Sequence, residues 1–74
     1  MLKFNLKQAL WDYQARTGIK MSYEELSGDT DISIETIKSI ATRQNYNATF
    51  KVVSVISKSL GIDPTDYIEW ETNE

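Results

Sequence analysis

Apolar residues recur along the chain in short stretches with helical spacing, and residues that favour helix ends separate these stretches. The first stretch follows the i, i+3, i+4, i+7 pattern of one helix face: Leu6, Ala9, Leu10 and Tyr13. Asn5 can cap the start of this helix, and Gly18 suits the left-handed conformation that often ends one. The pattern therefore predicts a first helix between Asn5 and Gly18.

Two further helix starts follow closely on one another. Ser22 and Glu25 have the spacing of a capping box, which predicts that a second helix begins there. We expect this helix to be short, because residues 27–31 (Ser-Gly-Asp-Thr-Asp) are poor helix formers. Ser33 can then cap a third helix over about residues 34–42, after which residues 45–47 have the composition of a loop.

The densest apolar stretch predicts a fourth helix, capped by Thr49 and ended by Gly61. Its apolar residues surround most of the helix circumference, as in a central and mostly buried helix: Phe50, Val52, Val53, Val55, Ile56 and Leu60. Residues 52–56 also have the propensity of a strand, but the length and the matching ends favour a helix. Pro64 directly after Asp63 predicts that a short fifth helix begins there.

Both ends of the chain also alternate between apolar and charged or polar residues, with the period of a strand. Lys3 lies between Leu2 and Phe4, and Glu69 lies between Ile68 and Trp70. One hypothesis is a two-stranded pairing of the termini, within one chain or exchanged between two copies. The other is that both segments are frayed helix ends, and the pattern alone does not decide between them.

Residues 21–40 resemble the helix-turn-helix of the phage-repressor/Cro-type (Xre) family. The matching positions are Glu25, Leu26, Ile32, Ser33, Thr36, Ile37 and Ile40. Residues 49–64 and 68–70 are similar to the fourth and fifth helices of that family, so the resemblance covers nearly the whole chain. It implies a single all-α, five-helix, lambda-repressor-like domain over residues 1–74, with the helix-turn-helix at about 22–42. The hypothesis of a short two-stranded pairing of the termini is compatible with this fold.

The chain departs from the family pattern at four positions of this motif. Tyr23 stands at the first position of the second helix, where Gln is frequent, and Asp31 stands where the turn usually has Gly. Asp tolerates the left-handed conformation less well than Gly but better than most residues. Ser27 and Thr30 replace small Ala and apolar Leu, so we expect weaker packing inside the motif.

The predicted third helix has the two faces that a reader of the DNA major groove requires. Ile37, Ile40 and Ala41 share the face expected to pack on the rest of the domain. The opposite face carries polar residues, of which Lys38 can donate to guanine and Glu35 can accept from cytosine. Ile34 on the flank can touch a thymine methyl group, and Ser33 at the helix start can hold a phosphate. The predicted DNA contacts are Tyr23, Ser33, Ile34, Glu35, Lys38, Ser39, Thr42, Arg43, Asn45, Asn47 and Thr49.

Each of these assignments has a structural alternative. Glu35 is more simply explained as an acid that favours a helix start, and Lys38 is equally explained as a solvated surface charge. Ile34 can seal the edge of the core, and Tyr23 can pack over the fourth helix. Trp11 and Tyr13 are most simply explained as aromatic residues of the core or its rim.

Composition and charge limit the possible functions. The 74 residues contain no Cys and no His, which removes disulfides, thiolate chemistry and the usual zinc ligands, and no residue pair suggests a nucleophile with its base. We therefore expect no enzyme activity, no metal site and no cofactor. The net charge of −3 is unevenly distributed, because residues 63–74 hold five acids and no cation while the first 62 residues hold all eight cations and six acids. Neither an export signal nor a membrane helix is evident, which favours a cytoplasmic protein.

Two functions remain. The first is a repressor-like transcriptional regulator that binds double-stranded DNA as a homodimer on two half-sites. Its predicted dimer patch is Tyr67, Ile68 and Trp70, residues that can equally close the core of the monomer. The second is a protein-binding module on the same scaffold, such as an antirepressor or modulator that binds a partner repressor.

Overall fold

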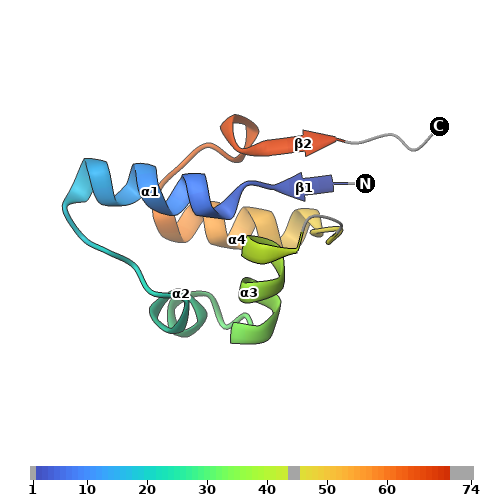
Figure 1. The fold of residues 1–74 in the computed structure, drawn as a ribbon, viewed down its shortest axis with the longest axis horizontal. Coiled ribbons are helices and arrows are strands. Elements are labelled where there is room, and N and C mark those ends of the chain that lie inside the picture. The colour runs from blue at the N-terminus through green and yellow to red at the C-terminus, as the bar shows by residue number, and fades with distance from the viewer. Residues whose placement is uncertain (1, 44–45, 71–74) are drawn as a thin grey trace.

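The computed structural model describes residues 2–43 and 46–70, which form a small helical domain with a two-stranded sheet (Figure 1). The elements confirm the predicted order of the first four helices. In chain order the helices and strands are β1 (Leu2–Phe4), α1 (Leu6–Thr17), α2 (Tyr23–Thr30), α3 (Ile34–Thr42), α4 (Phe50–Leu60) and β2 (Ile68–Trp70). A 3-10 turn (Pro64–Asp66) lies between α4 and β2.

The two termini pair as antiparallel strands within one chain, which confirms the pairing hypothesis. Leu2 lies opposite Trp70, Lys3 opposite Glu69, and Phe4 opposite Ile68. Leu2 and Phe4 are buried because they face the helices, whereas Lys3 and Glu69 share the other face of the sheet. The sheet thus closes the domain on the side away from α2, as Figure 1 shows.

The predicted fifth helix is wrong, because the chain forms only the 3-10 turn there. Asp63 caps this turn by accepting hydrogen bonds from the backbone N–H and the hydroxyl of Thr65. These hydrogen bonds hold the pKa of the Asp63 carboxyl below its ordinary value. The chain cannot continue as a helix, because the Tyr67 carbonyl accepts from Asn5 N–H at 2.7 Å and starts the pairing with the N-terminal segment.

Most predicted helix ends are confirmed by the local geometry. Ser22, Ser33 and Thr49 each accept a hydrogen bond from the backbone N–H three residues later, and Gly18 and Gly61 adopt the left-handed conformation. Asn5 is an exception, since its side chain makes no capping bond among the described residues.

The core is formed by side chains of all four helices and of β1. Its largest fully buried side chains are Leu6, Leu26, Ile37, Ile56, Leu60 and Ser57. The prediction that α4 is buried around most of its circumference is wrong at its first residue, because Phe50 is 66% exposed. The assignment of Trp11 to the core or its rim is also wrong, because its side chain is 76% exposed on the surface of α1.

The turn between α2 and α3 is held by side-chain hydroxyl groups. The Ser27 hydroxyl donates to the Ile32 carbonyl, and the Thr30 hydroxyl donates to the Leu26 carbonyl at 2.7 Å and accepts from Ile32 N–H at 3.3 Å. Residues 27–30 are therefore helical despite their low propensity, so the poor helix formers do not end α2 early. The two polar substitutions in the motif supply hydrogen bonds that fix the turn.

Asp31 occupies the left-handed position of this turn, with φ of 61°. Replacing it by Gly removes a Cβ penalty of about 1–2 kcal/mol, offset by about 0.4–1 kcal/mol of added entropy in the unfolded chain. We expect Asp31→Gly to raise the free energy of unfolding by roughly 0.5–1 kcal/mol, measured by urea denaturation. Asp31→Ala keeps the Cβ and serves as the control, and a gain in stability from Ala as large as that from Gly would contradict this explanation.

Candidate nucleic-acid interface

Helix α3 is anchored to the core by one face and open to solvent on the other. Ile37 is completely buried and Ile40 is 7% exposed, and both pack among the side chains of the core. The opposite face carries the exposed side chains of Glu35, Lys38 and Thr42. The structure therefore brings the predicted base-reading residues together on one solvent-facing surface, with Ser39 and Ile34 half-buried at its edges.

Two of the residues predicted to contact DNA, Ser33 and Thr42, also form hydrogen bonds that stabilise the ends of α3. The Ser33 hydroxyl accepts from Thr36 N–H at 3.3 Å and lies 2.8 Å from the Thr36 hydroxyl, so it fixes the start of α3. The Thr42 hydroxyl donates to the Lys38 carbonyl at 2.6 Å in the last turn. These bonds lie within the first and last turns of the helix, and the long exposed side chains of Lys38 and Glu35 are the best suited to reach a partner.

Asn47 and Thr49, in the segment after α3, have exposed side chains that are tied to the rest of the fold. Asn47 accepts a hydrogen bond from Leu2 N–H at 2.9 Å through its side-chain oxygen, and the Thr49 hydroxyl accepts from Val52 N–H. Arg43 is exposed at the end of α3. Asn45, also predicted to contact DNA, lies outside the described residues. Arg43 is thus the strongest candidate for a backbone contact on this side.

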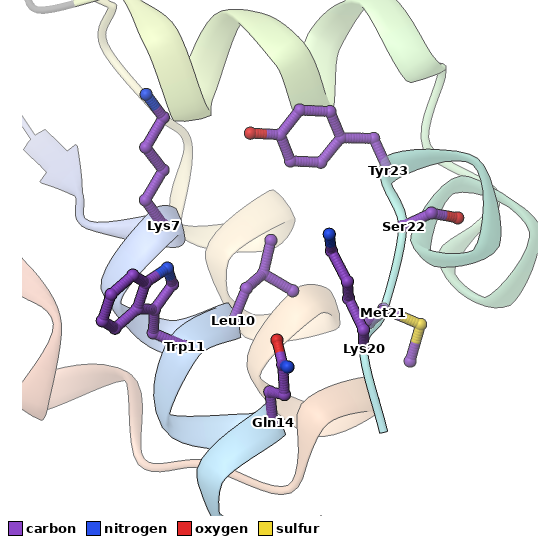
Figure 2. Close-up of a pocket in the computed structure, with 8 residues that line it drawn as sticks. All are labelled: Lys7, Leu10, Trp11, Gln14, Lys20, Met21, Ser22 and Tyr23. Atoms are coloured by element: carbon purple, nitrogen blue, oxygen red, sulfur yellow. The ribbon is translucent and has the colours of Figure 1, made fainter. Parts of the chain in front are cut away.

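A groove of about 410 Å³ opens between α1 and the start of α2, close to α3 (Figure 2). Tyr23 is half-buried on its wall and directs its hydroxyl across the groove toward the Lys7 side, while Leu10 lies between the two walls. Lys20 extends its ammonium group into the same space. The complete lining is Lys7, Leu10, Trp11, Gln14, Lys20, Met21, Ser22 and Tyr23.

The chemistry of this groove favours an anion. Within the described part of the chain its lining contains two ammonium groups and no carboxylate. The indole N–H of Trp11, the amide of Gln14 and the hydroxyl of Tyr23 are further hydrogen-bond donors. Phosphate oxygens are acceptors that such donors bind well.

Lys7 also lines a second, smaller hollow between the start of α1 and the end of α3. This hollow has a volume of about 220 Å³ and is bordered by Lys3, Arg43 and Glu69. Cations therefore border α3 from the groove at α2 to the end of the helix. Arg16, another cation, stabilises the fold, because its guanidinium donates a hydrogen bond to the Leu60 carbonyl at the end of α4.

Lys7 and Lys20 are absent from the contacts predicted from sequence. Lys7, Trp11 and Gln14 follow one another at i, i+4 and i+7, so a helical projection of residues 6–17 could have placed them on one face. No comparable local pattern connects Lys20 to that face, because the turn between α1 and α2 brings it there.

The residues predicted to form a dimer patch differ in their exposure. Tyr67 is half-buried and its hydroxyl donates to Asp12, a hydrogen bond that raises the pKa of Tyr67 above its ordinary value. Ile68 is half-buried against the core. Trp70 is 65% exposed and is the member of the patch that remains open to a partner.

A short helix joined by a tight turn to a second helix with an exposed polar face defines a helix-turn-helix protein. In agreement, a family model of the Cro/C1-type helix-turn-helix DNA-binding domain matches residues 10–73, and the chain belongs to this family. A comparison with curated proteins gave no match. None of the helices in the described residues is both long and apolar enough to cross a membrane.

Proposed function

We propose that this protein is a sequence-specific, repressor-like transcriptional regulator that binds double-stranded DNA as a homodimer. The observation that carries this proposal is the exposed polar face of α3, held rigidly by the buried side chains of Ile37 and Ile40. A helix presented in this way fits the width of the major groove. Membership of a DNA-binding family supports the same conclusion.

The residues proposed to contact the bases are Lys38 and Glu35, with Ile34 at the edge of the same surface. Lys38 donates to guanine O6 or N7, Glu35 accepts from cytosine N4, and Ile34 contacts a thymine methyl group. Ser39 and Thr42 extend the same polar face. These contacts discriminate between base pairs.

The two sides of α3 contact the DNA backbones that flank the groove. On one side Lys7, Lys20 and Tyr23 hold a phosphate in the groove between α1 and α2. On the other side Arg43 and the segment with Asn47 and Thr49 approach the opposite strand. These contacts supply affinity and fix the register of α3, and they carry no direct information on sequence.

A protein-binding module that contacts a partner repressor is the second candidate. The observation that favours it is the exposed carboxylate of Glu35 at the start of α3, in a chain with a net charge of −3. A carboxylate repels phosphate but pairs well with a cationic protein surface.

Salt dependence of binding distinguishes the two functions. In fluorescence anisotropy titrations with duplexes from the DNA beside its own gene, we expect one duplex to bind far more tightly than the rest. The logarithm of its association constant should fall linearly with the logarithm of the salt concentration, with a slope of roughly −0.9 for each phosphate neutralised. Absence of any binding at low salt, together with capture of a repressor protein, would replace the DNA-binding proposal by the second candidate.

A further inference from the structure

The groove between α1 and the start of α2 is larger than a single DNA phosphate requires. Its volume of about 410 Å³ lies within the range of about 300–1,000 Å³ that is typical of small-molecule sites. One phosphate group occupies only a small part of such a volume. The groove therefore has room for a separate small molecule.

One wall of the groove carries an exposed aromatic ring beside a cation. Trp11 is 76% exposed and follows Lys7 by four residues, so the two side chains lie on the same face of α1. Figure 2 shows the indole ring next to Leu10, which adds an apolar surface between the two walls. A flat aromatic molecule can pack on such a ring by stacking or edge-to-face contact.

The opposite wall adds a second cation and a second aromatic ring. Lys20 extends its ammonium group into the groove, and the ring of half-buried Tyr23 lies above it in Figure 2. Within the described part of the chain, the lining contains no carboxylate to pair with either lysine. An anionic ligand supplies the missing charge, whereas a cation is repelled.

The second hollow, beside the end of α3, is a poorer site for such a ligand. Its volume of about 220 Å³ is roughly half that of the groove. Its lining also includes Glu69, whose carboxylate repels an anion. Size and charge thus both favour the groove at α2.

We propose that the groove between α1 and α2 binds a small anion with a planar aromatic body, and that this ligand displaces DNA. The aromatic body packs on Trp11 and Leu10. The anionic group pairs with Lys20, and Lys7 adds positive charge from the opposite wall.

The displacement of DNA rests on the proposed function, in which Lys7, Lys20 and Tyr23 hold a phosphate of the DNA backbone. A ligand in the groove occupies the same donors, so the ligand and the DNA exclude each other. By linkage, each then lowers the affinity of the protein for the other by the same factor. The groove would make the binding of DNA responsive to a small molecule.

Nuclear magnetic resonance of the full chain without DNA tests the ligand site. The chain has two tryptophans and hence two indole N–H signals, and Trp70→Phe identifies the signal of Trp11. Trp70 lies on β2, outside the lining of the groove, so its signal is an internal control. The probes are phenyl phosphate and phenylacetate, which combine an aromatic ring with the two common anionic groups.

We expect at least one probe to shift the Trp11 signal with a Kd below about 1 mM, an affinity within reach of a ligand of roughly ten non-hydrogen atoms. Inorganic phosphate and acetate lack the ring, and benzyl alcohol lacks the charge, so each should bind at least about tenfold more weakly. Lys20→Ala should weaken the binding of the probe by about tenfold. Lys58→Ala is the matched control, because Lys58 is exposed on α4 outside the groove.

Three results would overturn the ligand site. Neither probe shifts the Trp11 signal, both indole signals shift alike, or inorganic phosphate binds as tightly as phenyl phosphate. In the last case the groove binds any phosphate and its aromatic wall has no part in recognition. A response to only one of the two probes supports the site and identifies the anionic group that it prefers.

Anisotropy titrations with the preferred duplex test the displacement. At a probe concentration about ten times its own Kd, the apparent Kd for DNA should rise by about tenfold. Potassium chloride at the same ionic strength is the control, since added salt alone weakens binding to DNA. An apparent Kd equal to that in the salt control overturns the displacement. A chain that binds the probe but no duplex refutes the proposed function and leaves the ligand site standing.

Discussion

Leu26→Ala is expected to lower the free energy of unfolding by about 2–5 kcal/mol, because it leaves a cavity that the surrounding helices cannot fill. Leu26 is completely buried in α2, among the side chains that also hold α3 and α4. A small domain has a total stability of about 5–15 kcal/mol, so this loss is a large fraction of it. Urea denaturation followed by circular dichroism measures the change.

Ile19→Ala is the control for this prediction. Ile19 is also a large aliphatic residue, but its side chain is 53% exposed. We expect its removal to change the stability by less than about 0.5 kcal/mol. Equal losses for the two variants would mean that Leu26 is not part of the core that supports the helix-turn-helix.

Most ends of the first four helices were predictable because the signals are local. Ser33 and Thr49 precede their helices and accept the expected hydrogen bonds, and Gly61 ends α4 in the left-handed conformation. A cap and the residues that it bonds lie within one turn of the chain. Such interactions depend little on the rest of the fold.

The fifth helix and the exposure of Phe50 were not predictable in this way, because both depend on distant parts of the chain. Asp63 and Pro64 form the local start of a helix, but the pairing of Ile68 with Phe4 makes the next residues a strand. Phe50 has the periodicity of a buried residue. Whether it is covered depends on where the sheet ends, which local spacing does not reveal.

The candidate site was predictable only in part. The polar face of α3 follows from the helical period, which placed Glu35 and Lys38 opposite Ile37. The groove beside it requires Lys20 to lie across from Lys7, and that arrangement arises from the path of the chain between α1 and α2. The helical period therefore predicts the polar face of α3, but no local pattern predicts the position of Lys20 on its flank.

Lys38→Ala and Lys20→Ala should weaken DNA binding in different ways if the proposed roles are correct. Lys38 lies on the exposed face of α3, so its loss should cost about 1–3 kcal/mol on the preferred duplex and relax specificity at one base pair. Lys20 borders the groove between α1 and α2 that is proposed to hold a phosphate, so its loss should weaken binding to every duplex alike and reduce the salt slope by about 1.

Anisotropy titrations of both variants against the preferred duplex, single-base variants of it and an unrelated duplex separate these two effects. Lys58→Ala is the matched control, because Lys58 is an exposed lysine in the last turn of α4, outside the linings of the groove and the second hollow, and should bind as the wild type does. If Lys38→Ala lowers affinity equally for all duplexes, Lys38 contacts phosphate and other residues must contact the bases. If Lys20→Ala leaves the salt slope unchanged, the groove between α1 and α2 does not hold a phosphate, and the DNA path must run on the Arg43 side of α3 alone.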